Sequence, residues 1–194
     1  MGLRASMLRH PIRAALVAVL TVAALAFGVA WFGPQYLFID RTVDEPPPSA
    51  STGTGARGPG AAPAGRDESS GGASPGGAGG ISLAEGKLRP LEHDASGRAL
   101  VIALPDGSRF LRFEELVTSN GPDLRVYLSD RPASDDWFVY DDGRFVDLGP
   151  LKGNLGSSNY EIPREVDLSE YRSAVVWCRR FSVGFAVAPL DPAS

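Results

Sequence analysis

Residues 41–80 contain no aromatic side chain and consist mainly of glycine, proline, alanine, serine and threonine. Such a segment cannot bury enough apolar surface to offset the conformational entropy that it would lose on ordering. The composition therefore predicts a disordered tether over residues 41–80, whose root-mean-square reach as a random coil is about 35 Å. About 110 of the 194 residues remain beyond Gly80, which is enough for one domain with a modest core.

An uncharged apolar run over residues 14–32 follows Arg4, Arg9 and Arg13. As a helix it would span about 28 Å, close to the thickness of a bilayer core. The leading arginines predict that residues 1–13 stay in the cytoplasm and that the chain after Phe32 lies outside. We therefore expect a single-pass cell-membrane protein with a transmembrane helix over residues 14–32 and an extracytoplasmic domain.

A cleaved signal peptide is the alternative, with Gly28, Val29 and Ala30 as a small-residue cleavage site. The apolar run is longer than the core of a usual signal peptide, which favours an uncleaved anchor. In both cases the domain after the run lies outside the cytoplasm.

The region from Ile81 onward is acidic, with 13 Lys and Arg residues against 18 Asp and Glu residues. Because nucleic-acid binding relies on a basic surface, nucleic acid is excluded as a partner. The chain has one cysteine, so no disulfide can form within it, and the domain must be held together by burial of apolar side chains.

Short alternating segments separated by turn residues recur after Ile81, and none of this region has sustained helical periodicity. Strands are predicted at 98–104, 109–113, 124–128, 137–140, 145–149 and 160–162. Pro105, Asp106 and Gly107 predict a hairpin turn, and Asp167 predicts the cap of one helical turn within 167–171. The pattern predicts an all-β fold, a single β-sandwich or small barrel.

Residues 174–189 (AVVWCRRFSVGFAVAP) are the most strand-like stretch of the chain. If the strand runs on without a bulge, its large side chains share one face and its small side chains share the other. This alternation predicts a strand in the core of the fold. The stretch also holds the single cysteine, Cys178, and is therefore the best candidate seat of chemistry.

Two roles for Cys178 are consistent with the sequence. It could be a redox thiol or a thiolate ligand to haem iron or another metal, and the adjacent Arg179 and Arg180 would favour the thiolate. It could equally be a buried structural residue, because free cysteine is among the most buried residue types. An unpaired thiol outside the cell is exposed to oxidation, so retaining one is unusual.

His93 is the one histidine outside the anchor region, and it could complete a ligand set with Cys178. The alternative is a turn residue that precedes the strand at 98–104. The chain has neither a haem-attachment Cys-x-x-Cys-His motif nor a Cys/His cluster for zinc, so we predict no metal site. The four aspartates at 135, 136, 141 and 142 lack the pattern of a calcium loop, and residues 153–156 lack that of a phosphate loop and are predicted to be a plain loop.

Six blocks of sequence occur in a characteristic order: 92–97, 119–129, 148–154, 160–163, 175–178 and 181–183. In this order they closely resemble the DM13 domain family and cover nearly all of residues 81–190. The anchor followed by Leu37, Phe38, Ile39 and Asp40 is similar to membrane-anchored bacterial members, and the Ala/Gly/Arg-rich composition is similar to actinobacterial ones.

The resemblance implies a β-rich extracytoplasmic domain that acts in electron transfer. The cysteine that marks the family falls on Cys178, as a redox thiol or a ligand to a prosthetic group, and His93 falls on another recurrent family position. Animal members occur beside haem-binding DOMON domains, which makes haem the candidate cofactor.

We therefore expect a DM13-like β domain over residues 81–190 that serves as an electron-transfer module. Cys178 would be its redox or ligating residue, with Trp177 packed beside it and His93 as a second cofactor-binding residue. The expected partners are the membrane and a redox partner protein or a cell-wall component. The alternative is a non-catalytic cell-surface binding domain in which Cys178 belongs to the core. Both hypotheses favour a module over an enzyme with its own turnover.

Overall fold

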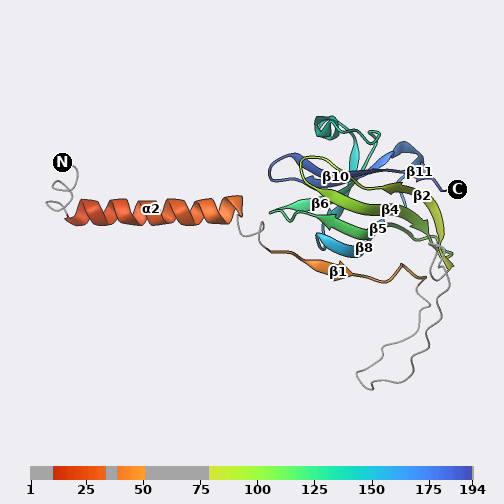
Figure 1. Cartoon of the computed structure of the whole chain (residues 1–194), viewed down its shortest axis with the longest axis horizontal. Coiled ribbons are helices and arrows are strands. Elements are labelled where there is room, and N and C mark those ends of the chain that lie inside the picture. Colours follow the sequence, from red (N-terminus) through yellow and green to blue (C-terminus); the bar gives the residue numbers. More distant parts are fainter. Residues whose placement is uncertain (1–10, 34–38, 51–78, 194) are drawn as a thin grey trace, which may run out of the picture.

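A computed structural model of the chain describes residues 11–33, 39–50 and 79–193. Residues 1–10 of the predicted cytoplasmic segment 1–13 and residues 51–78 of the predicted tether 41–80 lie outside the described residues. The N-terminal helix α2 (Pro11–Phe32) projects from a β-rich body (Figure 1). It begins at Pro11 rather than at residue 14, and Gly33, with φ of 59°, ends it in the left-handed conformation that favours glycine. Ile12–Trp31 is long and apolar enough to cross a membrane, with a mean hydropathy of 2.3.

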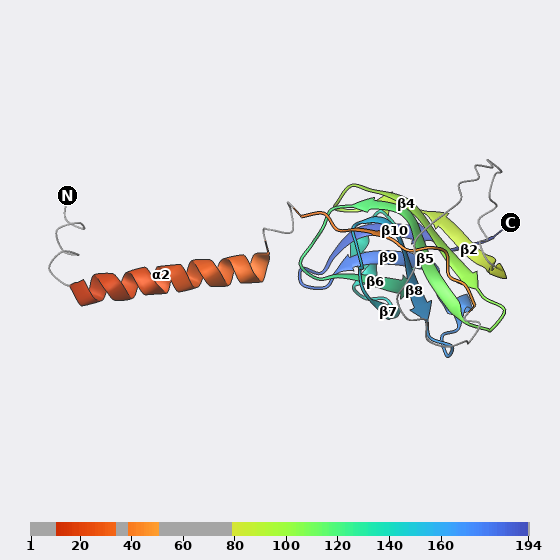
Figure 2. The same cartoon turned by 90° about the horizontal axis from the view of Figure 1, so that it is seen from below.

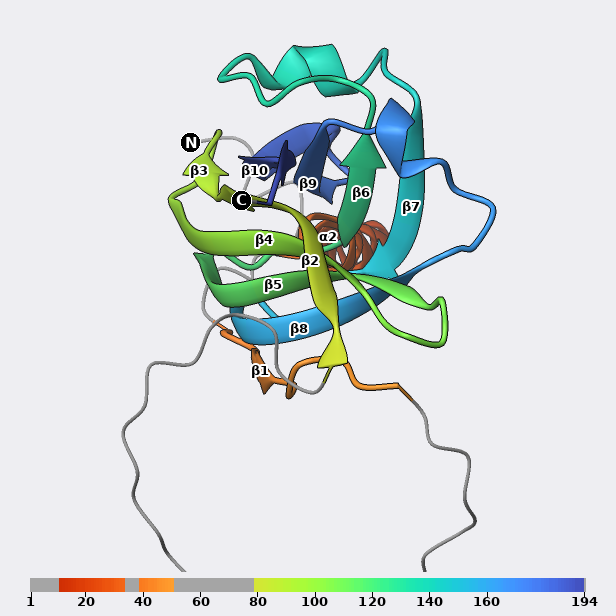
Figure 3. The same ribbon diagram turned by 90° about the vertical axis from the view of Figure 1, so that its right-hand side faces the viewer.

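The described residues form two β-sheets, which lie as two layers in Figure 3. The first sheet has the order β1 (Thr42–Asp44), β8 (Leu155–Ile162), β5 (Arg109–Thr118), β4 (Ala95–Ala103), β2 (Ile81–Lys87) and β11 (Asp191–Pro192). The second has the order β3 (Arg89–Pro90), β10 (Val183–Pro189), β9 (Ser173–Cys178), β6 (Leu124–Ser129) and β7 (Phe145–Pro150). Neighbouring strands are antiparallel except β1 and β8, which are parallel.

One interior cluster joins the inner faces of the two sheets. The first sheet contributes Leu111 and Phe113, and the second contributes Leu128 and Val176, all fully buried. Burial of such side chains stabilises each by about 1.5–3 kcal/mol relative to exposure. The all-β prediction is confirmed, and the two-layer arrangement agrees with the expected β-sandwich.

The predicted continuous strand over residues 174–189 is wrong, because the chain reverses there. It forms the hairpin β9–β10, in which Cys178 pairs with Val183. Arg179 and Arg180 lie in the turn, where their charged groups stay exposed, and Ser182 takes a φ of 50° to complete the reversal. The small side chains of β9 face the interior cluster, whereas Val175 and Trp177 face outward.

That outward face is covered by a second cluster beneath the 3-10 helix η3 (Trp137–Tyr140), so both faces of β9 are buried. A strand was predicted at 137–140 instead. The helical turn forms because the Asp136 carboxylate accepts a hydrogen bond from the Phe138 backbone N–H and caps it. The hydroxyl of Tyr140 accepts a hydrogen bond from the Ser134 N–H and fixes the other end.

The other predicted elements differ from the structure mainly in length. The strands at 98–104, 109–113, 124–128, 145–149 and 160–162 correspond to β4, β5, β6, β7 and β8. The turn at 105–108 joins β4 to β5, and η4 (Leu168–Glu170) is capped by Asp167 as predicted. β8 starts at Leu155, so the second half of the predicted loop 153–156 is strand.

The start of the predicted tether is part of the fold. β1 pairs in parallel with β8, with Thr42 opposite Leu155 and Asp44 opposite Ser157, and it lies at the edge of the first sheet (Figures 1 and 3). Residues 42–44 are therefore not a tether, since their backbone groups are committed to the sheet.

Candidate functional site

Cys178 is the last residue of β9 and a free thiol with no exposed surface. Its cross-strand neighbours are Leu124 on β6 and Val183 on β10. The side chain belongs to the interior cluster together with those of Leu124 and Phe185. The sulfur therefore lies inside the fold, at the end of the second sheet where the β9–β10 turn begins.

Phe185 connects this end of the cluster to His93. The two rings stack with centroids 3.8 Å apart and planes inclined by 26°. His93 lies in the bend before β4, which confirms its predicted place in a turn. Partial burial lowers the pKa of the imidazole below its ordinary value, although the charges of Glu92 and Asp94 oppose this shift. Partial burial of the ring therefore favours the neutral imidazole over the charged form.

A turn closes the same end of the sandwich. Residues 120–123 lead into β6, and a Cβ atom added to Gly121 would lie 3.1 Å from both Leu124 Cδ2 and Phe185 Cζ. A side chain at this position would therefore require Leu124 and Phe185 to move by a few tenths of an ångström. Leu124, Phe185 and Gly121 thus pack together where β9 ends.

A small pocket of about 210 Å³ lies on the outer side of this turn. Its walls include Asn120, Pro122, Leu124, Leu151 and Asn154. Cys178 does not line it, but Leu124 does, and Leu124 is the cross-strand partner of Cys178. Leu124 is therefore the residue that both lines this pocket and pairs with Cys178.

Comparison with protein families identifies the chain. The family model described as "Electron transfer DM13" matches residues 87–190, which is more than half of the 194 residues. The chain belongs to the DM13 family. The match covers β4 to β10 and includes Cys178 and His93, while α2 and β1 lie before it. No curated protein and no solved structure matched the chain.

The two arginines after Cys178 are directed to other groups in this DM13 domain. Arg179 Nε donates to Asp123 Oδ2 at 2.9 Å, and its backbone N–H donates to the Asp123 carbonyl at 3.0 Å. Arg180 Nη1 donates to the Trp31 carbonyl at the end of α2 at 2.6 Å. Both side chains are exposed. The described contacts of these arginines are with Asp123 and Trp31. Neither side chain makes a described contact with Cys178, so no described contact supports the prediction that their charges favour the thiolate.

The sequence predicted that Trp177 packs beside the thiol, and this prediction is wrong. Successive residues of a strand point to opposite faces, so Trp177 lies in the outer cluster, with its ring centroid 6.2 Å from that of Trp137. Trp137 Nε1 in turn donates to Glu92 Oε1 at 2.6 Å.

The packing around Cys178 does not fit a haem. A haem iron needs an open coordination position at the sulfur and a cavity for the ring, and Cys178 is covered by the side chains of both sheets. Among the described residues, no group of three or more His, Cys, Asp and Glu side chains could hold a metal ion. We therefore derive no chemistry from haem at this position.

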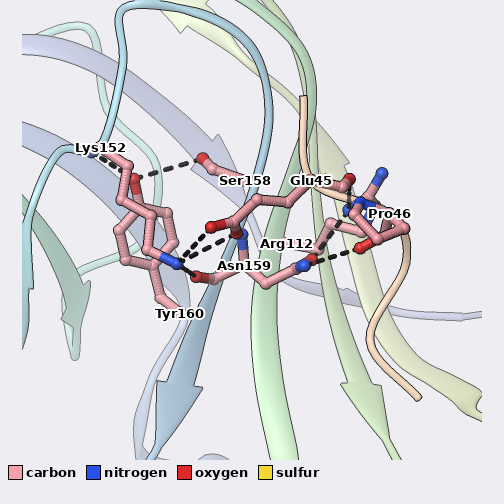
Figure 4. A network of polar contacts seen from close by, with 7 residues as sticks. All are labelled: Glu45, Pro46, Arg112, Lys152, Ser158, Asn159 and Tyr160. Carbon is pink, nitrogen blue, oxygen red and sulfur yellow. Dashed lines mark hydrogen bonds and ion pairs between the residues drawn. The ribbon is translucent and has the colours of Figure 1, made fainter. Parts of the chain in front are cut away.

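A polar network that no sequence pattern predicted holds residues 45 and 46 against β8 (Figure 4). The Glu45 carboxylate accepts hydrogen bonds from Lys152 Nζ at 2.8 Å and from the Asn159 N–H at 2.7 Å. Arg112 Nη1 donates to the Glu45 carbonyl at 3.0 Å and to Asn159 Oδ1 at 2.8 Å. Arg112 is a buried charge, and its Nε donates to Glu114 Oε1 at 3.0 Å.

Asn154 links residues 40 and 41 to the domain as well, and it is 1% exposed. Its Oδ1 accepts from the Arg41 N–H at 2.7 Å, and its Nδ2 donates to Asp40 Oδ1 at 2.9 Å and to the Thr118 carbonyl at 2.8 Å. The only sequence signal was its place in the block 148–154 that resembles the family.

Proposed function

We propose that this protein is a membrane-anchored, extracytoplasmic electron-transfer module whose redox group is the Cys178 thiol. Membership of the DM13 family supports the electron-transfer role. The length and hydropathy of Ile12–Trp31 support the anchor. The observation that carries the role of Cys178 is its position: a free thiol at the end of β9, separated from the pocket at residues 120–124 by Leu124.

The thiol would react by exchange with a disulfide of a partner protein. The Cys178 thiolate attacks one sulfur of that disulfide, a new S–S bond forms, and the partner's other sulfur leaves as a thiolate. Because Cys178 is buried, this step needs a local opening at Leu124 and the turn 120–123. A ligand role for His93 stays a prediction.

Thiol labelling of the full chain in detergent tests this proposal. Cys178 is titrated with a thiol reagent in the native and the denatured protein, and an absorption spectrum is recorded after haem addition. We expect native labelling that is faster than global unfolding, no haem spectrum, and no labelling in Cys178→Ala. Native labelling that occurs only at the rate of global unfolding would contradict a redox thiol.

Two matched leucine variants locate the opening. Leu124 and Leu128 lie on the inner face of β6, opposite Cys178 and Ala174 respectively. Both leucine-to-alanine changes should destabilise the domain by about 2–5 kcal/mol. Only Leu124→Ala should speed native labelling beyond what its loss of stability explains. Equal acceleration by Leu128→Ala would show that Cys178 is reached by global unfolding.

A non-catalytic surface-binding domain is the second candidate, and one observation favours it. Cys178 is fully buried beside Val176 and Ala174, as expected of a cysteine that only fills the core. In that case the labelling experiment would give a thiol that reacts only after unfolding, with no effect specific to Leu124→Ala.

A further inference from the structure

We infer that the domain is docked directly on the bilayer by the end that carries the turns 120–123 and 179–182, with Arg180 placed to bind anionic lipid headgroups. This inference rests on the proposed membrane anchor and not on the redox role of Cys178. It replaces the expectation of a domain held away from the membrane by a tether of 40 residues.

The chain contacts the domain again from residue 39 onward, soon after the end of the helix. Ile39 accepts a hydrogen bond at its carbonyl from Asn120 Nδ2 at 2.7 Å, and the buried Asn154 binds both Asp40 and the Arg41 N–H. β1 then pairs with β8 over residues 42–44. These contacts hold residues 39–44 on the domain, so they cannot act as a free tether.

Only a short length of chain remains between the end of the helix and the domain. From Gly33 to Ile39 the chain can extend by at most about 20 Å, at 3.3–3.6 Å per residue. Residues 51–78, by contrast, join two segments that both belong to the domain, since β1 precedes them and β2 follows them in the same sheet. Residues 51–78 therefore connect two strands of the domain, and their number does not set the distance between the helix and the domain.

The end of α2 lies near the β9–β10 turn, at the end of the β body that faces the helix (Figures 1 and 2). The Arg180 guanidinium lies 5.6 Å from the centroid of the Trp31 ring and donates to the Trp31 carbonyl. Trp31 ends the span that would cross the membrane, and tryptophan at such a position lies at headgroup level. The turn that contains Arg180 is therefore also at headgroup level.

The charges at this end fit a phosphate-bearing surface. Arg179 is paired with Asp123 and the Asp40 carboxylate accepts a hydrogen bond from Asn154, whereas Arg180 and Arg41 have no carboxylate partner among the described residues. Phe181 beside them is 43% exposed. Guanidinium groups bind phosphates with paired hydrogen bonds, and an adjacent aromatic ring is suited to the lipid interface. The partner that matches these features is a bilayer with anionic headgroups.

Fluorescence quenching in nanodiscs tests the docking. The full chain, in a Cys178→Ala background, carries a bimane label either at Ser182→Cys in the turn or at Glu165→Cys. Residue 165 follows β8, whose last residue, Ile162, pairs with the first residue of β5, Arg109. This end of the first sheet is opposite to the end that carries the turn 120–123. The quencher is a phospholipid with a nitroxide on its headgroup. We expect strong quenching at position 182 and little at position 165, and equal quenching would overturn the inference.

Two length variants separate the tether from the loop. Deleting residues 56–73 should leave quenching unchanged at both positions. Inserting a Gly/Ser segment of about 30 residues after Gly33 should reduce quenching at position 182, because the domain can then move away. A change on deletion within 51–78 would show that this segment holds the domain, and would overturn the inference.

The lipid arm uses the insertion variant in nanodiscs of phosphatidylcholine with or without phosphatidylglycerol. Quenching at position 182 should rise with phosphatidylglycerol, and Arg180→Gln should remove this rise while Arg164→Gln should not. Absence of any dependence on phosphatidylglycerol would overturn the role of Arg180. A chain that fails to enter nanodiscs would overturn both the anchor and the docking, whereas incorporation without different quenching would overturn the docking alone.

Discussion

Cys178 is enclosed by aliphatic side chains of both sheets, so substitutions there act on packing as well as on chemistry. We expect Cys178→Ala to lower the free energy of unfolding by about 1 kcal/mol, because a small cavity replaces the sulfur. Cys178→Ser should cost more, about 1–3 kcal/mol, because it buries a hydroxyl among apolar groups. Urea unfolding of the two variants measures the difference, and a serine variant as stable as the alanine variant would contradict the packing described here.

Asn154 links residues 40 and 41 to the strands of the first sheet. Its amide binds Asp40, Arg41 and Thr118 from a position that is almost fully buried. Asn154→Ala should therefore lower the free energy of unfolding by about 2–3 kcal/mol, since several buried partners lose their hydrogen bonds.

The matched control for Asn154 is Asn120→Ala, which removes a more exposed hydrogen bond to the same segment and should cost about 1 kcal/mol. Thermal unfolding of both variants in detergent gives the comparison. Similar small losses for the two variants would mean that the segment 39–44 contributes little to the fold.

At the scale of elements, β1 depends on an ionised carboxylate. Partial burial alone would raise the pKa of Glu45, but the hydrogen bonds from Lys152 and Asn159 and the charges of Lys152 and Arg112 outweigh it and lower the pKa below the ordinary 4.5. A carboxylate with a lowered pKa in the folded state stabilises that state fully above its unfolded pKa, and this stabilisation is lost as the pH falls through the folded pKa.

We therefore predict that β1 detaches as the pH falls below 4.5 and through the lowered pKa of Glu45, before the rest of the first sheet opens. Amide hydrogen exchange of residues 42–44 against that of β4 measures this. Glu45→Gln should expose the β1 amides already at neutral pH and should make their protection insensitive to pH in this range. The prediction would be wrong if the β1 amides and the β4 amides lost their protection against exchange at the same pH.

At the scale of the whole molecule, the anchor, β1 and the β body form a single chain path in which residues 51–78 connect two strands of one sheet. Shortening a loop reduces the entropy cost of closing it by about 0.6 kcal/mol per halving of its length. Deletion of residues 56–73 should therefore leave the Tm unchanged or raise it slightly. A clear fall in Tm would show that these residues pack against the domain.

Much of the local structure could be predicted because it depends on local patterns. The apolar run indicated α2, alternation indicated β4 to β8, and the Pro-Asp-Gly and Asp167 signals marked a hairpin and a capped turn. The residues that resemble the DM13 family indicated the family that the comparison then identified. These features depend on side chains within a few residues of one another, so periodicity and turn chemistry are sufficient to find them.

What only the tertiary structure decided depends on contacts between distant residues. Residues 41–44 directly precede a stretch rich in glycine and proline, yet the side chain of Asn154 and the edge of β8 supply partners for their backbone groups. Residues 174–189 alternate like one long strand, yet the chain reverses between β9 and β10. At this reversal Arg179 binds Asp123, which lies in the turn before β6. Whether Cys178 is exposed likewise depends on Leu124 and Phe185, which pack around it from neighbouring strands. Sequence periodicity carries no information on such pairings, because their free energy comes from groups that meet only when the sheets assemble.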